Sequence, residues 1–357
     1  MSINKNIPRY RKIYEELKDE ILSGRYSADD FFPPERVLKE RFEVSHLTVR
    51  KALSLLVEEN LIRRESGCGT KVIYQHDEPF QQVMREVTAL NFLVERADDF
   101  FSNIINRLET ACRLRSIRFS LYCLHSDPDL HESQFARAAA DPKAVIVYSP
   151  CLRNFNKLKF NPALARTIIL DETAPGLDVP QVVSADVDGM YSLTDYLASL
   201  GHRVIAHVSA ENKTSGLNRL AGYRRAVERH GLANRDSLVA CGNYTTEQSY
   251  HAFRGIMDKN PDCTACVCAN DYSAFGVMRA LNEMELEPGR DFSLAGYGNY
   301  EISEVLGLTS VDQQPDLLCD QIVHSLDRYI ATGVMPRDVY TIPVDLKLRT
   351  SCGPVRV

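Results

Sequence analysis

The sequence predicts an α/β protein in two parts: a small N-terminal unit of three helices and a β-hairpin, then a larger body of parallel sheets in two lobes. Two observations carry this prediction. Apolar residues recur at helical spacing through the first 75 residues. From about residue 89, short apolar strands alternate with amphipathic helices, which is the pattern of βαβ units and parallel sheets. A length of 357 residues fits such a multidomain chain.

Composition excludes membrane and exported proteins. Hydrophobic residues make up 44% and charged residues 25%, as in ordinary globular chains. The longest apolar runs, 144–148 and 167–170, are far shorter than the roughly 20 residues of a membrane-spanning helix. The polar start MSINKNIPRYRKIYEEL lacks the apolar core of a secretory signal, and the sparse cysteines predict no disulfide framework. We therefore expect a cytoplasmic protein with no membrane partner.

The first two helices follow from local signals. The first is indicated by four apolar residues at helical spacing, Tyr10, Ile13, Leu17 and Ile21. It stops at Ser23-Gly24. The double proline Pro33-Pro34 then opens a second helix, because proline is tolerated in a first turn.

A third helix is predicted over 46–58, with Ser45 as its N-cap. Its inward side is apolar and consists of Val49, Leu53, Leu56 and Val57. Two strands, 61–65 and 70–74, follow, and the segment 66–69 joins them as a hairpin with a flexible tip. Three helices and such a hairpin make a winged helix-turn-helix.

The outward side of the third helix carries the side chains that would meet DNA: Ser45, His46, Leu47, Thr48, Arg50 and Lys51. An α-helix fits the major groove, where arginine bonds guanine and threonine reaches a base edge or a phosphate. Residues 1–75 carry a net charge of +2 and the rest of the chain −8, so charge favours a nucleic-acid contact here. A surface helix with ordinary charges is the alternative.

Several motifs in this unit are specific in residue type and spacing: Ser23-Gly24-x-Tyr26, Pro34-x-Arg36, Val44-Ser45-x-x-Thr48-Val49-Arg50-x-Ala52-Leu53 and Gly67-x-Gly69-Thr70. Over residues 8–74 they resemble the GntR (gluconate-repressor-type) DNA-binding domain. The resemblance implies operator contacts from Arg36, Ser45, Thr48, Arg50 and Gly69, and we assign Tyr10, His46 and Leu47 to the same surface. His46 stands where the family often has arginine, which should alter base preference rather than abolish binding.

The body begins after a polar segment, 76–88, that predicts a linker between a first domain, 1–75, and a second, 89–357. Strand candidates in the body are 90–94, 119–124, 144–148, 167–170, 204–209, 238–241, 265–269 and 293–297. Ligands of such folds bind at the carboxyl ends of the strands.

The cluster Cys263-x-x-Cys266-x-Cys268 has two interpretations. A tetrahedral zinc site needs a second ligand pair, and the neighbouring sequence offers no CxxC or HxxxH. The run TACVCA also has the pattern of a buried strand, in which free cysteine behaves as a small apolar residue. We favour the core strand and predict no metal or cofactor.

Motifs of the body also occur in a fixed order: Leu200-Gly201-His202-Arg203-x-Ile205-Ala206, Arg219-x-x-Gly222-Tyr223, Cys268-Ala269-Asn270-Asp271 and Val311-Asp312-Gln313. They resemble the regulatory domain of the lactose/galactose repressor family across roughly 89–350. The resemblance implies the fold of periplasmic sugar-binding proteins and a ligand between two lobes. It implies that Arg219 forks onto ligand hydroxyls or a carboxylate, that Asn270 bonds ligand oxygens, and that Tyr244 stacks on the ligand. Further contacts are expected from Asp188, Gln313, Asp99 and Phe100.

One departure from this family concerns the strand end that usually reads Gly-Phe/Tyr-Asp-Asp. Here the sequence is Gly296-Tyr297-Gly298-Asn299. The missing carboxylate would have accepted charge-assisted hydrogen bonds worth about 1.5–3 kcal/mol. Three consequences are open: Asn299 or Asp188 substitutes for it, the ligand is not a typical sugar, or the cleft binds nothing.

A GntR-type DNA-binding domain followed by a regulatory domain of the lactose/galactose repressor type resembles the arabinose-repressor-like regulators. The predicted function is a homodimeric transcription factor, a repressor, that binds a palindromic operator in double-stranded DNA. A small effector, a sugar, would control its affinity. The alternative is a DNA-binding regulator whose body only dimerises or senses a non-sugar ligand. An enzyme is not expected, because the chain has no nucleophile elbow, phosphate loop or HExxH motif.

Overall fold

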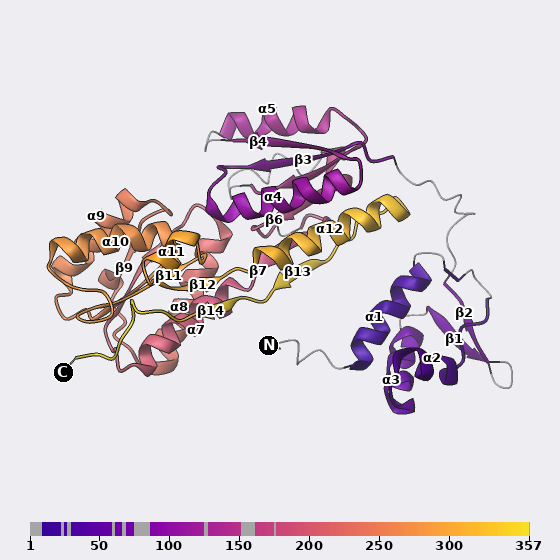
Figure 1. The fold of residues 1–357 in the computed structure, drawn as a ribbon, viewed down its shortest axis with the longest axis horizontal. Helices are drawn as coiled ribbons and strands as arrows, with labels where there is room; N and C mark the ends of the chain where they lie inside the picture. Colours follow the sequence, from indigo (N-terminus) through magenta and orange to yellow (C-terminus); the bar gives the residue numbers. More distant parts are fainter. Residues whose placement is uncertain are drawn as a thin grey trace. The chain divides into compact units, whose positions relative to one another are not determined.

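The computed structural model describes residues 9–22, 25–26, 30–58, 61–65, 69–74, 86–124, 128–150, 161–174 and 176–356. The chain forms two compact units, one within residues 1–84 and the other containing nearly all of the rest (Figure 1). The predicted linker lies outside the described residues, except for 86–88.

The N-terminal unit has the predicted elements, α1 (Arg9–Leu22), α2 (Glu35–Phe42), α3 (His46–Glu58) and the antiparallel hairpin of β1 (Ile62–Glu65) and β2 (Gly69–Val72). Its core joins the three helices to the hairpin. In α3, Val49, Leu53 and Leu56 are fully buried, but Val57 is exposed, which corrects the prediction for this residue. Ala52 completes the buried stripe instead, because a helix turns by 100° per residue and Val57 falls beyond its edge.

The first lobe of the body is a parallel sheet, covered on both faces by helices. Its strand order is β13 (Val339–Ile342), β7 (Gln181–Ser184), β6 (Thr167–Leu170), β5 (Ala144–Tyr148), β3 (Ala89–Val94) and β4 (Arg118–Cys123). Helices α4 (Asp99–Leu114) and α12 (Pro315–Thr332) share one core with the sheet, and α5 (Pro128–Ala139) packs into a separate core on the other face (Figure 1). A short 3-10 helix, η2 (Pro162–Arg166), precedes β6.

The second lobe repeats this three-layer arrangement. Its sheet runs β14 (Asp345–Lys347), β12 (Thr309–Asp312), β11 (Ser293–Tyr297), β10 (Ala265–Cys268), β8 (Ile205–Ser209) and β9 (Val239–Cys241), parallel except for β14. Helices α7 (Asp186–Ser199) and α8 (Thr214–His230) pack on one face, and α9 (Thr246–Lys259) and α10 (Asp271–Glu283) on the other. The 3-10 helix η3 (Asp236–Leu238) and the short helix α11 (Glu301–Val305) complete the lobe.

The α/β class and the eight predicted strands of the body are confirmed, with ends that agree to within one residue. Four short strands, β7, β12, β13 and β14, were not predicted. Each has only three or four residues, too few for a period of two to stand out. Cys266 and Cys268 are fully buried in β10, as the core-strand interpretation predicted.

The crossing of α7 and α8 depends on Gly222. A β-carbon there would overlap the carbonyl oxygen of Val187 and lie 3.0 Å from the backbone nitrogen of Tyr191. Gly222→Ala is therefore expected to destabilise the body by about 1–3 kcal/mol, because the two helices must separate. The control is Gly255→Ala in α9, where a β-carbon meets nothing within 4 Å and a gain of about 0.5–1 kcal/mol is expected. Urea unfolding followed by circular dichroism distinguishes the two, and equal stabilities would contradict the close crossing.

Candidate functional site

The first candidate surface is the exposed side of α3. Ser45 caps the helix, since its hydroxyl accepts from the backbone N–H of Thr48 at 3.3 Å, and its Oγ lies 2.8 Å from the Thr48 Oγ1. Both hydroxyls therefore stand at the helix N-terminus. Leu47 projects beside them with 78% of its area exposed. An apolar side chain held out in this way on a basic surface can contact a thymine methyl group.

A carboxylate that the sequence analysis missed organises the basic side chains of this surface. Glu35, in the first turn of α2, lies 3.0 Å from His46 Nε2, 3.7 Å from Arg50 Nε and 3.2 Å from Arg64 Nη2. These contacts join α2, α3 and β1. DNA phosphates would compete with Glu35 for the two arginines, so the pairs hold the cations in place before DNA arrives.

The remaining predicted DNA contacts are distributed around α3. Tyr10 of α1 lies under the ammonium of Lys51, 4.1 Å from the ring centre, and Arg36 is exposed in the first turn of α2. Gly69 begins β2 with φ +107°, a conformation that other residues rarely adopt. The tip of the hairpin, 66–68, lies outside the described residues.

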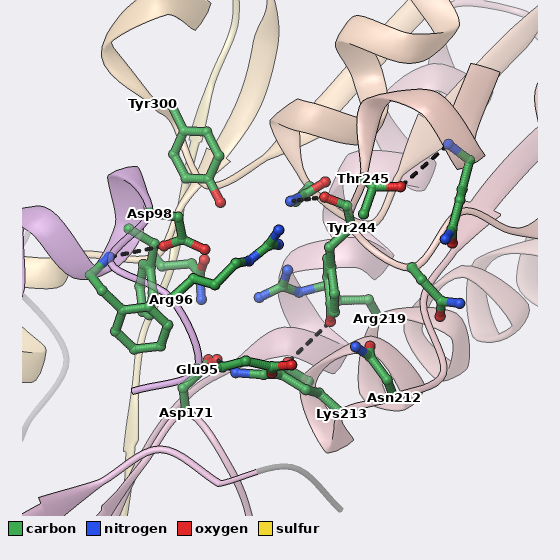
Figure 2. Close-up of a pocket in the computed structure, with 17 residues that line it drawn as sticks. Glu95, Arg96, Asp98, Asp171, Asn212, Lys213, Arg219, Tyr244, Thr245 and Tyr300 are labelled. Carbon is green, nitrogen blue, oxygen red and sulfur yellow. Dashed lines mark hydrogen bonds and ion pairs between the residues drawn. The ribbon is translucent and has the colours of Figure 1, made fainter. Parts of the chain in front are cut away.

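The second candidate site is a cavity in the body, of about 180 Å³. Its walls come from both lobes and stand at the carboxyl ends of β3, β6, β8, β9, β10, β11 and β12, where α/β folds place their ligands. Figure 2 shows the lining side chains. The residues that line it are Glu95, Arg96, Asp98, Phe100, Phe101, Asp171, Asn212, Lys213, Ser215, Arg219, Asn243, Tyr244, Thr245, Gln248, Asn270, Tyr300 and Gln313.

Five residues predicted to bind ligand line this cavity: Phe100, Arg219, Tyr244, Asn270 and Gln313. Arg219 is buried and firmly held. Its Nε donates to Asp186 at 2.8 Å, its Nη1 donates to the carbonyl of Ala269 at 2.7 Å, and its guanidinium lies 3.9 Å from the ring centre of Tyr297. Burial raises the pKa of Asp186 to about 6, although the charge of Arg219 opposes the rise.

Tyr244 and Asn270 are placed by the loops before α9 and α10. Tyr244 has φ +64°, which is strained for a residue with a side chain, and its hydroxyl lies 3.1 Å from Ser215 Oγ. Asn270 caps α10 by accepting from the backbone N–H of Ser273 at 2.8 Å. Gln313 donates to the hydroxyl of Ser184 at 3.2 Å. Part of each polar group is therefore already used by the protein.

Three predicted residues do not line this cavity. Asp99 and Asn299 line a neighbouring one of about 620 Å³, where Asn299 donates to Asp312 at 3.2 Å and accepts from Arg349 at 2.6 Å. Asp188 lies on the solvent side of α7, paired with Arg225 at 2.8 Å. Arg225 thus holds Asp188 away from the candidate cavity, and Asn299 lines the neighbouring cavity together with Gly298, the position of the missing carboxylate.

Gly298 has a steric reason for lacking a side chain. It has φ +126°, and a β-carbon there would lie 2.5 Å from Cε1 of Tyr300. The Tyr300 ring is buried, and its hydroxyl points into the cavity (Figure 2). An aromatic side chain that the sequence analysis missed therefore occupies this end of the site.

Asp171 was also missed, and it is a strong candidate for ligand binding. It follows β6 with φ +58°, it is buried, and its Oδ2 lies 3.7 Å from Lys213 Nζ. Among the described residues, its Oδ1 has no hydrogen-bond partner. A buried oxygen without a donor costs free energy, so a ligand hydroxyl or amine that donated to it would bind favourably.

The neighbouring Glu172 connects the two lobes. Its two carboxylate oxygens accept from the backbone N–H of Thr214, at 3.1 and 3.0 Å, at the N-terminus of α8. Burial raises the pKa of Glu172 to about 7, against the lowering effects of Lys213 and Thr214. Lys213 also reaches the first lobe, at 3.5 Å from the hydroxyl of Ser149. These contacts join the lobes beside the cavity.

Comparison with known proteins agrees with this two-part organisation. Residues 9–72 match the family of bacterial regulatory proteins called gntR, and residues 194–352 match the periplasmic binding protein-like domain. The chain is 26% identical over 313 residues to the arabinose metabolism transcriptional repressor of Geobacillus stearothermophilus, covering 83% of each protein. It is 25% identical over 258 residues to the repressor PurR of Histophilus somni, covering 71% of this chain and 77% of that one.

Solved structures share the fold of the body. Transcription regulator CcpA of Lactococcus lactis superposes with a TM-score of 0.68 at 18% identity, covering 74% of this chain and 99% of that one. A LacI family regulator from Enterococcus faecium with bound ribose gives a TM-score of 0.65 at 22% identity, covering 75% of this chain and 100% of that one.

The match of residues 9–72 to bacterial regulatory proteins of the gntR family, together with repressors that align over 83% of the chain, defines a transcriptional regulator. The chain carries a gntR-family DNA-binding domain joined to a periplasmic-binding-protein-like domain, so the resemblance predicted from its motifs is confirmed. The relatives found in these comparisons are transcriptional regulators rather than enzymes. In the part of the chain that the structure describes, helices are too short or too polar to cross a bilayer.

Proposed function

We propose that this regulator is a homodimeric repressor that binds a palindromic operator in the cytoplasm and responds to a sugar or closely related effector in the cavity of the body. The observation that carries the proposal is the cavity, because residues from both lobes line it at the strand ends. A ligand there touches both lobes, so it stabilises one lobe arrangement over others. The relatives that are named repressors of arabinose metabolism support a sugar.

A dimer is supported by apolar side chains exposed on the second lobe and the start of α12. Ile302, Val305, Leu306 and Leu317 each expose two-fifths or more of their area. Ile302 and Val305 line the neighbouring cavity together with Pro315. Large apolar side chains exposed close together in the chain, as at 302–306, are typical of protein–protein contacts. Two copies would present two α3 helices to an operator with two-fold symmetry.

The test measures operator affinity with and without sugars. A duplex selected by the protein from random DNA is titrated by fluorescence anisotropy in the presence of aldoses, ketoses, uronates and aldonates. At least one of them is expected to change the affinity about 5- to 150-fold, the usual range of allosteric coupling. Asp171→Asn should raise the effector concentration that gives half of this response by about tenfold, since a charged acceptor is lost.

The matched control is Asp195→Asn, which removes a partly exposed carboxylate of α7 that contacts His230 of α8. This variant should respond like the unchanged protein. An affinity for DNA that no compound of the panel alters would contradict control by a sugar.

A second candidate is a regulator whose body dimerises or senses a non-sugar ligand. The orientations of Asp188 and Asn299 favour it, because neither supplies the carboxylate that the family uses for sugar hydroxyls. Calorimetry that shows no heat with the sugar panel, while DNA binding stays intact, would favour this candidate.

A further inference from the structure

We propose that the effector is a small polyhydroxylated molecule with one acidic group, and that Arg96 binds that group. This inference rests on the proposed function, because it names the chemical class of the ligand in the same cavity. It adds a specificity-determining residue that lies outside the motifs of the body.

Arg96 is placed to meet a ligand. It follows β3 in the first lobe and lines the cavity. Figure 2 shows Arg96 and Arg219, which come from different lobes, pointing toward one another across the cavity. Among the described residues, the Arg96 side chain has no hydrogen bond or ion pair. Two guanidinium groups that face each other repel, and an acidic group bound between them would relieve the repulsion.

Two cations of the cavity have a carboxylate within ion-pair distance. Asp186 pairs with Arg219 at 2.8 Å, and Asp171 pairs with Lys213 at 3.7 Å. The Asp98 carboxylate acts electrostatically on Arg96, but it caps α4 by accepting from the backbone N–H of Phe101 at 3.2 Å. Glu95 also lines the cavity and has an interaction partner of its own. Among the described residues, Arg96 is therefore the lining cation that no carboxylate contacts directly, so its guanidinium donors remain available to a ligand.

Helix N-termini add to the preference for an acidic group. The loops that begin α9 and α10 contribute the lining residues Thr245 and Asn270. The partial positive charge of a helix N-terminus favours an anion. The N-terminus of α8 already has the Glu172 carboxylate as its anion, so the termini of α9 and α10 are the ones that face a ligand together with Arg96.

The rest of the ligand must donate hydrogen bonds and offer a face to aromatic rings. The unpartnered Oδ1 of buried Asp171 requires a donor such as a hydroxyl group. Phe100, Tyr244 and Tyr300 supply aromatic surface around the cavity. A volume of about 180 Å³ favours a small ligand. A sugar acid or a sugar phosphate combines these properties, and a neutral sugar lacks the group that Arg96 would bind.

The experiment compares matched pairs on the full-length protein by isothermal titration calorimetry. D-glucose is compared with D-glucuronate, D-gluconate and D-glucose 6-phosphate. D-galactose is compared with D-galacturonate and D-galactonate. Inorganic phosphate alone is the bare-anion control. We expect at least one acid to bind about tenfold or more tightly than its neutral partner, as expected for a hydrogen bond to a charged group. The carboxylate and phosphate arms show which acidic group fits.

Variants of Arg96 test the assignment directly. Arg96→Met should lower the affinity for the acid by about tenfold or more and so remove its preference over the neutral sugar, whereas Arg96→Lys should retain part of the preference. Arg113→Met is the matched control, because Arg113 is exposed in the last turn of α4, at the end of the helix away from the cavity. The acid preference should also decrease as NaCl is raised, since salt screens the pairing.

The outcomes separate this inference from the proposed function. Neutral sugars that bind as tightly as their acids would overturn the role of Arg96 and leave sugar control intact. An acid preference that survives in Arg96→Met would also overturn the role of Arg96 without affecting sugar control. Inorganic phosphate that binds as tightly as the acids would do the same. If neither neutral nor acidic members of the panel bind, both the inference and the sugar part of the proposed function fail.

Discussion

Arg219→Met is expected to lower the free energy of unfolding of the body by about 3–5 kcal/mol, because it leaves Asp186 buried without its ion pair. The loss should be larger at pH 8 than at pH 5. Burial raises the pKa of Asp186 to about 6 even with Arg219 present, and removing Arg219 removes a contribution that lowers it. A carboxyl group whose pKa is raised in the folded state makes that state less stable as the pH rises from the pKa of the unfolded chain toward the pKa of the folded one.

Urea unfolding at the two pH values measures this effect, and a double variant supplies the control. Arg219→Met combined with Asp186→Asn should recover part of the lost stability, since the uncompensated charge is gone. Arg219→Lys should be less damaging than Arg219→Met, because it keeps a cation near Asp186. A single variant as stable as the unchanged protein at pH 8 would show that the pair does not hold the lobe together.

Arg50→Ala is expected to weaken operator binding about 5- to 150-fold, which corresponds to about 1–3 kcal/mol. Arg50 is exposed on α3, and its Nε lies 3.7 Å from the Glu35 carboxylate. At this distance the guanidinium can leave Glu35 and bind DNA instead. If Arg50 contacts a base, the loss should be confined to the selected duplex. A contact to phosphate would weaken binding to every sequence alike and reduce the dependence on salt.

The comparison for Arg50 is Lys12→Ala, which removes one positive charge from an exposed position of α1. Both variants are titrated by fluorescence anisotropy against the selected duplex and a scrambled one. Lys12→Ala should stay within about twofold of the unchanged protein. Two residues turn a helix by about 200°, so Lys12 lies on the opposite side of α1 from Tyr10, and its charge acts only through screened electrostatics. Equal losses in both variants would mean that α3 has no special role in binding DNA.

Local signals explain how much of the fold could be predicted. The bounds of α3 follow from the cap at Ser45 and an apolar stripe of period 3.6, both of which act within a few residues. The buried strands of the body are short apolar runs between helices, which the chain shows without tertiary context. Strands such as β14 were missed because their place at a sheet edge depends on a distant partner, β12.

The cavity shows where sequence reasoning stops. Arg219 and Asn270 were found because they sit in recognisable motifs. Asp188 was predicted as a cavity residue, but it faces solvent. Asp186, two residues earlier, faces Arg219 instead, since two residues turn a helix by about 200°. Arg96 and Asp171 have no motif, and only the meeting of the lobes makes them neighbours of the same cavity.

The amino-acid sequence by itself determined the two-part architecture, the exposed side of α3 and the class of regulator, because helical period, caps and motif spacing are encoded within short segments. Only the tertiary structure decided which charges meet in the cavity. The Glu172 carboxylate meets the N–H of Thr214 across 42 residues of sequence, and no local pattern encodes a contact that forms when two lobes close around a common space.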